Sequence, residues 1–217
     1  AMSSDLAHEA AMDAIKDDYI RRGMPDFICL SPTDSAGYDT SEASMALDPE
    51  PYSKADVWAG KVNLTDRHVK YWNSVLAELR KWNPKLGVAV YAYAAYRTPP
   101  RTVRLTPGAF HVQIVPSWYE EDEEIWQGWG EQAQAMYLRP NWPWNGGSSP
   151  FYPLHKMGAF IEFAHANKMQ GFDMDSLTGF FGMRGPFYYL IVRKMAHPEI
   201  PTDAIVEEFV SAFGEAR

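Results

Sequence analysis

The feature that most constrains the fold of this chain is the alternation of short apolar runs with segments of helical periodicity. The runs occupy residues 27–30, 88–93, 110–115, 135–138 and 171–174. Strands that alternate with helices along a chain form parallel sheets. The sequence therefore predicts an α/β fold built from parallel β/α units, with about five strands.

The segments between these runs supply the helices. Tyr71, Val75 and Leu79, for example, recur at the spacing of one helical face. Two connections depart from strict alternation: residues 31–57 are a long polar segment, and the link between the second and third strands is too short for a full helix. Such periodicity, with start and stop residues, predicts helices over 4–22, 65–82, 119–133, 154–168, 186–196 and 202–213.

The length of the chain limits how the strands can be arranged. With 217 residues it is expected to form a single β/α domain over 1–217, in which Ala1 and Met2 are a remnant of a tag. A closed (β/α)8 TIM barrel takes about 250 residues. We therefore expect either an open sheet or a partial barrel of the TIM type. Its unpaired edge would be covered by self-association or by a missing N-terminal segment that completes the barrel.

Charge and composition exclude several classes of partner. The net charge of −8 argues against nucleic acid, whose phosphates need a basic surface. No apolar run approaches the roughly 20 residues of a membrane-spanning helix, so no membrane span is expected. The single cysteine, Cys29, lies within the first predicted strand. It has no partner for an intramolecular disulfide, and we expect it to be a small buried residue.

Aromatic, amide and acidic residues gather directly after the predicted strands. The carboxyl ends of parallel strands meet on one face, where α/β proteins carry their chemistry. Glycoside hydrolysis needs two carboxylates that flank the scissile bond. The candidates are Asp34 after the first strand and Asp175 at the end of the last, with Asp173 in reserve. Asp34 has an alternative interpretation as the cap of a turn that follows Pro32.

The same strand ends offer a surface for a sugar. Flat rings pack on the apolar faces of sugars, and arginine and asparagine donate hydrogen bonds to hydroxyls. Arg97 could bind the carboxylate of a uronic acid, or could form a surface ion pair instead. The Trp142 and Trp144 pair could alternatively pack a proline-rich loop. The candidate substrate-binding residues are Tyr91, Tyr93, Tyr96, Arg97, Trp118, Tyr119, Arg139, Asn141, Trp142 and Trp144.

Motifs for other kinds of chemistry are missing from the sequence. The six histidines form no HExxH or other metal-binding spacing, so no metal is expected. Gly146 and Gly147 lack the lysine and the spacing of a phosphate-binding loop. No GxSxG nucleophile motif is present either. We therefore expect no cofactor.

Three segments of the sequence are distinctive. They are residues 27–38 (FICLSPTDSAGY), 71–100 and the closing segment 171–216, with its Gly-Pro-Phe-Tyr-Tyr-Leu and His-Pro-Glu steps. In these segments the chain resembles the DUF4838 family of bacterial, glycoside-hydrolase-like TIM-barrel proteins. In the family, further β/α units precede this region. The resemblance therefore implies that the chain matches the C-terminal portion of such a barrel. It also makes a secreted or periplasmic location the expectation.

Together these features predict a carbohydrate-active protein of glycoside-hydrolase type, which acts on an oligo- or polysaccharide at the carboxyl face of its strands. Two alternatives stay open. One is a non-catalytic glycan-binding module, which the abundance of rings and the scarcity of strand-end carboxylates favour. The other is a barrel fragment that is inactive without its missing N-terminal strands.

Overall fold

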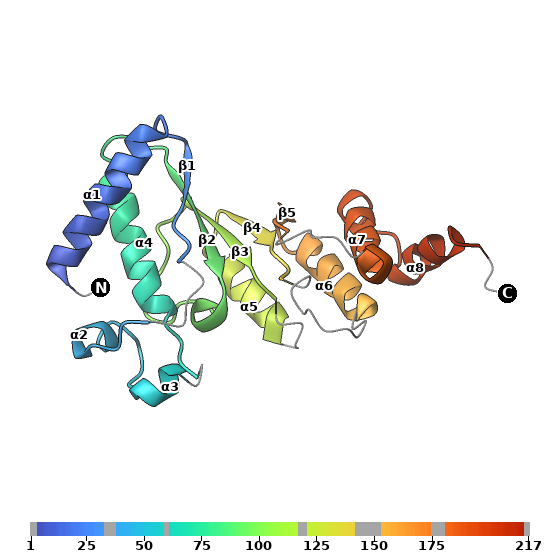
Figure 1. Ribbon diagram of the computed structural model, residues 1–217, viewed down its shortest axis with the longest axis horizontal. Coiled ribbons are helices and arrows are strands. Elements are labelled where there is room, and N and C mark those ends of the chain that lie inside the picture. Colours follow the sequence, from blue (N-terminus) through green and yellow to red (C-terminus); the bar gives the residue numbers. More distant parts are fainter. Residues whose placement is uncertain are drawn as a thin grey trace.

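The computed structural model describes residues 4–32, 38–58, 61–116, 121–141, 153–174 and 181–214. Its five strands form one sheet in which every neighbouring pair is parallel. Figure 1 shows α1 and α4 beside β1 and β2, and α6, α7 and α8 toward the opposite end. The elements, in chain order, are α1 (Asp5–Arg21), β1 (Phe27–Cys29), α2 (Glu42–Met45), α3 (Lys54–Trp58), α4 (Thr65–Leu79), β2 (Gly87–Ala92), the 3-10 helix η1 (Ala94–Tyr96), β3 (Phe110–Ile114), α5 (Glu121–Gly130), β4 (Ala135–Leu138), α6 (Leu154–Ala166), β5 (Met169–Phe172), α7 (Phe181–Ala196) and α8 (Thr202–Ser211).

The strand order identifies how the sheet is wound. The strands lie side by side in the order β1-β2-β3-β4-β5, which is also their order along the chain. A doubly wound sheet reverses its strand order at a switch point, and this sheet does not. Every connection therefore steps in the same direction, as it does in a β/α barrel. The predicted α/β fold is confirmed, and the sheet is compatible with part of a (β/α) barrel.

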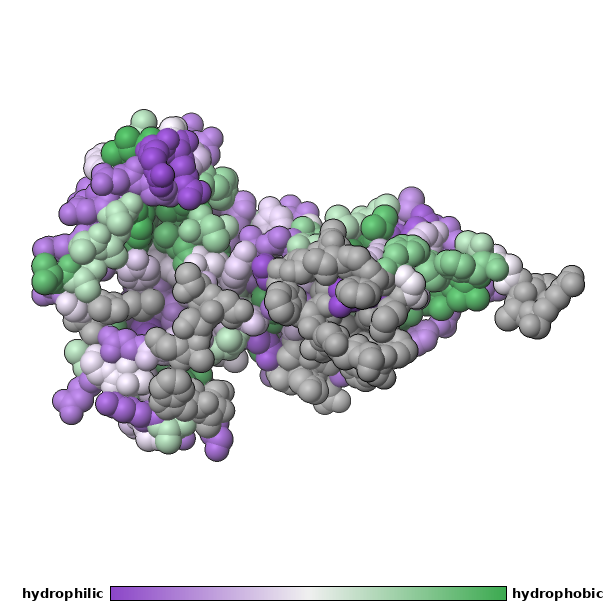
Figure 2. All heavy atoms as spheres, viewed as in Figure 1, coloured by the Kyte–Doolittle hydropathy of each residue, from purple (hydrophilic) through white to green (hydrophobic). Residues whose placement is uncertain are grey.

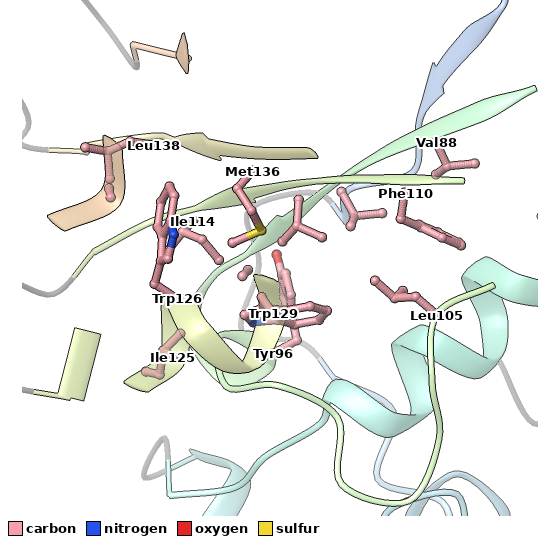
Figure 3. Packing of buried hydrophobic residues seen from close by; sticks show 14 of the residues in the cluster. Val88, Tyr96, Leu105, Phe110, Ile114, Ile125, Trp126, Trp129, Met136 and Leu138 are labelled. Atoms are coloured by element: carbon pink, nitrogen blue, oxygen red, sulfur yellow. The ribbon is translucent and has the colours of Figure 1, made fainter. Parts of the chain in front are cut away.

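One face of the sheet, here called the helix face, holds the hydrophobic core. Val88 and Val90 of β2, Val112 and Ile114 of β3 and Leu138 of β4 all have no exposed surface. Figure 3 shows these strands directing side chains toward Trp126 and Trp129 of α5. Both tryptophans are fully buried. This packing explains why the alternating apolar residues of the runs form strands, since each run buries every second side chain against the helices.

The other face, here called the open face, carries side chains that are only half-buried or exposed. Phe27 of β1 crosses Gly87 of β2, where an added Cβ would lie 2.2 Å from its ring, and its ring centroid lies 4.4 Å from that of His111 of β3. His111 in turn stacks on Tyr137 of β4 at 5.7 Å. Parallel sheets are normally covered on both faces. The expectation that Cys29 is buried is wrong, because Cys29 points to this open face and is exposed.

The connection between β2 and β3 contains no full helix, as predicted, and α4 holds it in place. The Asp66 carboxylate, which is 1% exposed, accepts hydrogen bonds from the backbone N–H groups of Arg101 at 2.7 Å and Thr102 at 2.9 Å. Asn73 Oδ1 accepts another from the N–H of Thr106 at 2.9 Å. These side chains replace the helical hydrogen bonds that the connection lacks.

The segment after β1 is held against the same helix by one arginine. Arg67 of α4 donates from Nε to both carboxylate oxygens of Asp48, at 2.9 and 3.1 Å, and from Nη1 to the carbonyl of Asp39 at 2.8 Å. Its Nη2 also contacts Asp48 and the hydroxyl of Tyr52. Burial and the hydrogen bond to Asp48 raise the pKa of Tyr52 above its usual value. The segment predicted as one long loop thus contains α2 and α3 and has its own anchor.

The helices at the end of the chain show one difference from the sequence prediction. α7 begins at Phe181 and includes Pro186, whereas the pattern predicted a start at residue 186. Figure 2 shows hydrophobic surface over α7 and α8, where Phe181, Val210 and Phe213 are 59%, 57% and 71% exposed. None of the described helices is both long enough and apolar enough to cross a membrane.

Candidate functional site

Four of the predicted site residues meet at the carboxyl ends of β2, β4 and β5. The hub is Arg139, which directly follows β4. Its guanidinium carbon lies 4.3 Å from the ring centroid of Tyr91 on β2. Its Nε donates to Asp173 Oδ2 at 3.2 Å, and its Nη1 donates to Asn141 Oδ1 at 2.8 Å. We call Tyr91, Arg139, Asn141 and Asp173 the strand-end cluster.

The register of the sheet explains why these residues meet. Tyr91 pairs with Gln113, and Gln113 pairs with Tyr137, so these three side chains share the open face. Arg139 lies two residues beyond Tyr137 and therefore projects from the same face. Backbone hydrogen bonds continue the sheet past the strand ends, from Arg139 N–H to the Ile114 carbonyl at 2.8 Å and from Asp173 N–H to the Leu138 carbonyl at 2.9 Å. This ladder places Asp173 beside the end of β4.

The residues that follow β2 take different positions. Tyr93 is half-buried, and its ring lies 6.5 Å from that of Tyr96 in an edge-to-face contact. Tyr96 is 3% exposed and stacks on His68 of α4 at 4.6 Å, and Figure 3 shows it among the core side chains. Arg97 pairs with Asp122, whose side chain is 2% exposed. Its backbone carbonyl accepts from Trp129 Nε1 at 2.7 Å. Tyr96 and Arg97 thus join β2 to α4 and α5.

Six of the predicted site residues lie outside the described ranges. They are the catalytic candidates Asp34 and Asp175 and the ring-bearing candidates Trp118, Tyr119, Trp142 and Trp144. All six are close in sequence to a strand end, since each follows one of β1, β3, β4 and β5 along the chain.

His68 of α4 is buried, with 2% of its surface exposed. Its Nδ1 lies 2.8 Å from the Leu64 carbonyl, and burial lowers its pKa to about 4. The ring is therefore neutral near pH 7, and its Nδ1–H donates to that carbonyl. His68 acts as a core residue that packs against Tyr96 and Trp72. Among the described residues there is no group of three or more His, Cys, Asp or Glu side chains that could hold a metal ion.

The sequence reasoning missed Gln113, which lies between Tyr91 and Tyr137 on the open face. Its carboxamide oxygen is buried and has no hydrogen-bond partner among the described residues. The signal was present in the sequence, because Gln113 is a polar residue at an alternate position of β3, between the apolar residues Val112 and Ile114. Tyr137 was missed in the same way.

The strand-end cluster brings an aromatic ring and several polar groups to one place. The Arg139 guanidinium lies over the ring of Tyr91, while Asn141 and Asp173 bring an amide and a carboxylate to the same place. Side chains from three strands converge there, at the edge where β/α proteins bind their ligands. Asp173 is the catalytic candidate that lies within the described residues, and its carboxylate is held by Arg139.

Comparison with known proteins gives one match. A family model described as a domain of unknown function, DUF4838, matches residues 1–217. No curated protein and no solved structure matches the chain. The match spans the whole sequence, including the strand-end cluster and the closing helices, and it agrees with the resemblance found in the sequence segments. The chain belongs to the DUF4838 family.

Proposed function

We propose that this protein is carbohydrate-active and binds a glycan at the carboxyl edge of its sheet, as a protein of glycoside-hydrolase type. The observation that carries the proposal is the strand-end cluster, in which Arg139 links the Tyr91 ring, the Asn141 amide and the Asp173 carboxylate. Sugars present apolar ring faces and hydroxyl groups together. A site for them needs planar side chains next to hydrogen-bonding groups, and this cluster supplies both.

The hydrolytic part of the proposal depends on a pair of carboxylates. Asp173 lies in the cluster with 41% of its side chain exposed, so a ligand can reach it. The pair predicted from the sequence is Asp34 and Asp175, one as the acid and the other as the nucleophile or base, with Asp173 in reserve. If the protein hydrolyses a glycan, Asp34→Asn and Asp175→Asn should each remove turnover and leave glycan affinity nearly unchanged.

A non-catalytic glycan-binding module is the second candidate. The observation that favours it is the ion pair between Asp173 and Arg139, at 3.2 Å. A carboxylate held in this way can fix the orientation of Arg139 instead of taking part in a reaction. In this case the strand-end cluster serves binding alone, and the aspartate substitutions should have no turnover to remove.

The experiment that tests the proposal is a screen of the protein against immobilised oligosaccharides and soluble polysaccharides, followed by variants of the cluster. Tyr91→Ala should weaken binding to the best-scoring glycan at least tenfold, because it removes the planar partner of Arg139. Tyr188→Ala, which changes a half-buried tyrosine on α7 outside the strand-end cluster, is the matched control. Equal binding by the wild type and Tyr91→Ala would refute the proposed location. An absence of glycan binding by the wild type across the screen would refute the function.

A further inference from the structure

Gln113 of β3 is a polar residue whose presence in the sheet is not explained by its packing. Its Oε1 atom is buried, and within the described part of the chain it accepts no hydrogen bond. Buried polar groups in native proteins nearly always have a partner, and an unpaired acceptor destabilises the protein that carries it. An apolar residue of the same size would avoid that cost. The position of Gln113 therefore calls for a function outside the folding of the sheet.

The surroundings of Gln113 connect it to the strand-end cluster. By register it lies between Tyr91 of β2 and Tyr137 of β4. Arg139 starts from the end of β4, yet its guanidinium lies over the ring of Tyr91 on β2. Since β3 lies between these two strands, the contact between Tyr91 and Arg139 spans β3 on the face that carries Gln113. Gln113 thus lies in the floor of the strand-end cluster, on the strand between the two partners of this contact.

The charges around the cluster determine which ligand suits it. Arg139 already has the carboxylate of Asp173 at 3.2 Å and the amide oxygen of Asn141 at 2.8 Å. Arg97, the other candidate for a uronic acid, pairs with Asp122. Both arginines are therefore compensated by carboxylates of the protein. An unpaired acceptor such as Gln113 Oε1 suits a hydroxyl group, which can donate a hydrogen bond to it, whereas a carboxylate has no hydrogen to donate.

We infer that the site is specific for neutral sugars and that Gln113 determines this specificity, by accepting a hydrogen bond from a ligand hydroxyl at Oε1. The inference rests on the proposed function and deepens it. Because Oε1 is buried in the free protein, the Gln113 carboxamide turns toward the ligand on the open face when the ligand binds. The ligand hydroxyl then donates to an acceptor that has no partner in the free protein.

The test compares Gln113→Leu with the wild type in stability and in binding. Leucine has a similar volume and removes the unpaired acceptor, so the urea midpoint of this variant should be unchanged or higher. Its affinity for the best-scoring neutral glycan of the immobilised panel should fall at least tenfold. Gln170→Leu, an exposed glutamine of β5, is the matched control and should leave both quantities unchanged. In the wild type, neutral oligosaccharides should bind at least tenfold more tightly than their uronic acid counterparts.

Monodeoxy analogues of the best-scoring glycan identify the hydrogen bond itself. For the wild type, removing one particular hydroxyl should weaken binding about as much as the Gln113→Leu substitution weakens binding of the parent glycan. The Gln113→Leu variant should bind this analogue and the parent glycan with equal affinity. Wild-type affinity in Gln113→Leu, with weakened binding in Tyr91→Ala, would overturn the inference and retain the proposed function. A lowered urea midpoint in Gln113→Leu, or a preference for uronic acids, would also overturn it. Failure of the wild type to bind any glycan would overturn the proposed function.

Discussion

Replacement of Arg67 by methionine should lower the free energy of unfolding far more than the loss of a surface ion pair does, because it releases the segment after β1. The side chains of Arg67 and Asp48 are 3% and 1% exposed, so neither charge is solvated by bulk water. The methionine side chain fills much of the arginine stem but leaves the Asp48 carboxylate buried without its cation. Removal of one partner from a buried pair typically costs about 3–5 kcal/mol. The loss of the hydrogen bond from Arg67 Nη1 to the Asp39 carbonyl, at 2.8 Å, adds to this destabilisation.

The assay is urea unfolding followed by circular dichroism, together with hydrogen exchange of the α2 amides. A change of about 3–5 kcal/mol corresponds to roughly two to three and a half orders of magnitude in an equilibrium constant. Part of it can appear as local detachment, so the N–H of Met45, bonded to the Ser41 carbonyl at 2.9 Å, should exchange faster in the variant.

Arg101→Met provides the control for this prediction. Arg101 pairs with Glu50 of the same segment, but the two side chains are 53% and 70% exposed. Exposed pairs contribute about 0–1 kcal/mol. A loss in Arg67→Met no larger than that in Arg101→Met, with unchanged exchange of the α2 amides, would refute the reasoning from burial.

Three further predictions concern buried polar residues. Burial lowers the pKa of His68 in the folded protein to about 4, below its usual value of 6.5, so between these pH values the unfolded chain takes up a proton that the native protein does not. Stability should therefore fall by up to about 3 kcal/mol as the pH decreases from about 6.5 to about 4, and His68→Gln should lose this dependence in urea unfolding at several pH values. An identical pH dependence in both proteins would contradict this cause. Asp66→Asn should lower the free energy of unfolding by about 2–4 kcal/mol, because the N–H groups of Arg101 and Thr102 donate to different carboxylate oxygens and an asparagine replaces one of these with an NH2 group. A loss below about 0.5 kcal/mol would show that the connection has another anchor. Lys194, which has no exposed surface, donates to Glu162 and to the Ile200 carbonyl at 2.5 Å. Lys194→Met should therefore lower the free energy of unfolding by about 2–4 kcal/mol, whereas Lys85→Met, which changes an exposed lysine, should have almost no effect. Equal melting temperatures of the two variants would refute this role of Lys194.

Most of the fold could be predicted from the sequence, because each strand buries every second residue against the helices. Val88, Val90, Val112 and Ile114 show this period directly, and they are fully buried. The errors arise where local patterns compete with packing. β5 spans Met169–Phe172, two residues before its predicted position, since Lys168 adopts a φ of 72° and starts the strand at once.

The position of α7 shows a second limit of local patterns. The predicted helix began at Pro186, and proline is common in the first turn of a helix. The structure continues the helix back to Phe181, with Pro186 inside it. Cys29 shows a third limit: parallel strands are usually covered on both faces, and the uncovered open face has no signature in a single strand.

The candidate site was predictable only as far as the strand period extends. Two-residue alternation places Tyr91 and Arg139 on one face, and the structure brings them together. Beyond the end of β2 the alternation fails, because Ala94 adopts a φ of 48° and the 3-10 turn directs Tyr96 into the core. The pairing of Arg97 with Asp122 joins residues 25 positions apart, and no local pattern specifies such a contact.

The central claim is that the strand-end cluster binds a glycan, and titration calorimetry of Arg139→Met tests it most directly. Arg139 holds Tyr91, Asn141 and Asp173 in one arrangement, so its loss should weaken binding of the best-scoring glycan at least tenfold, or about 1.4 kcal/mol. The matched variant Arg193→Met removes an arginine of α7 that pairs with Glu208 at 3.0 Å, away from the strand ends, and should bind as the wild type does. Wild-type affinity in a folded Arg139→Met protein would contradict the account.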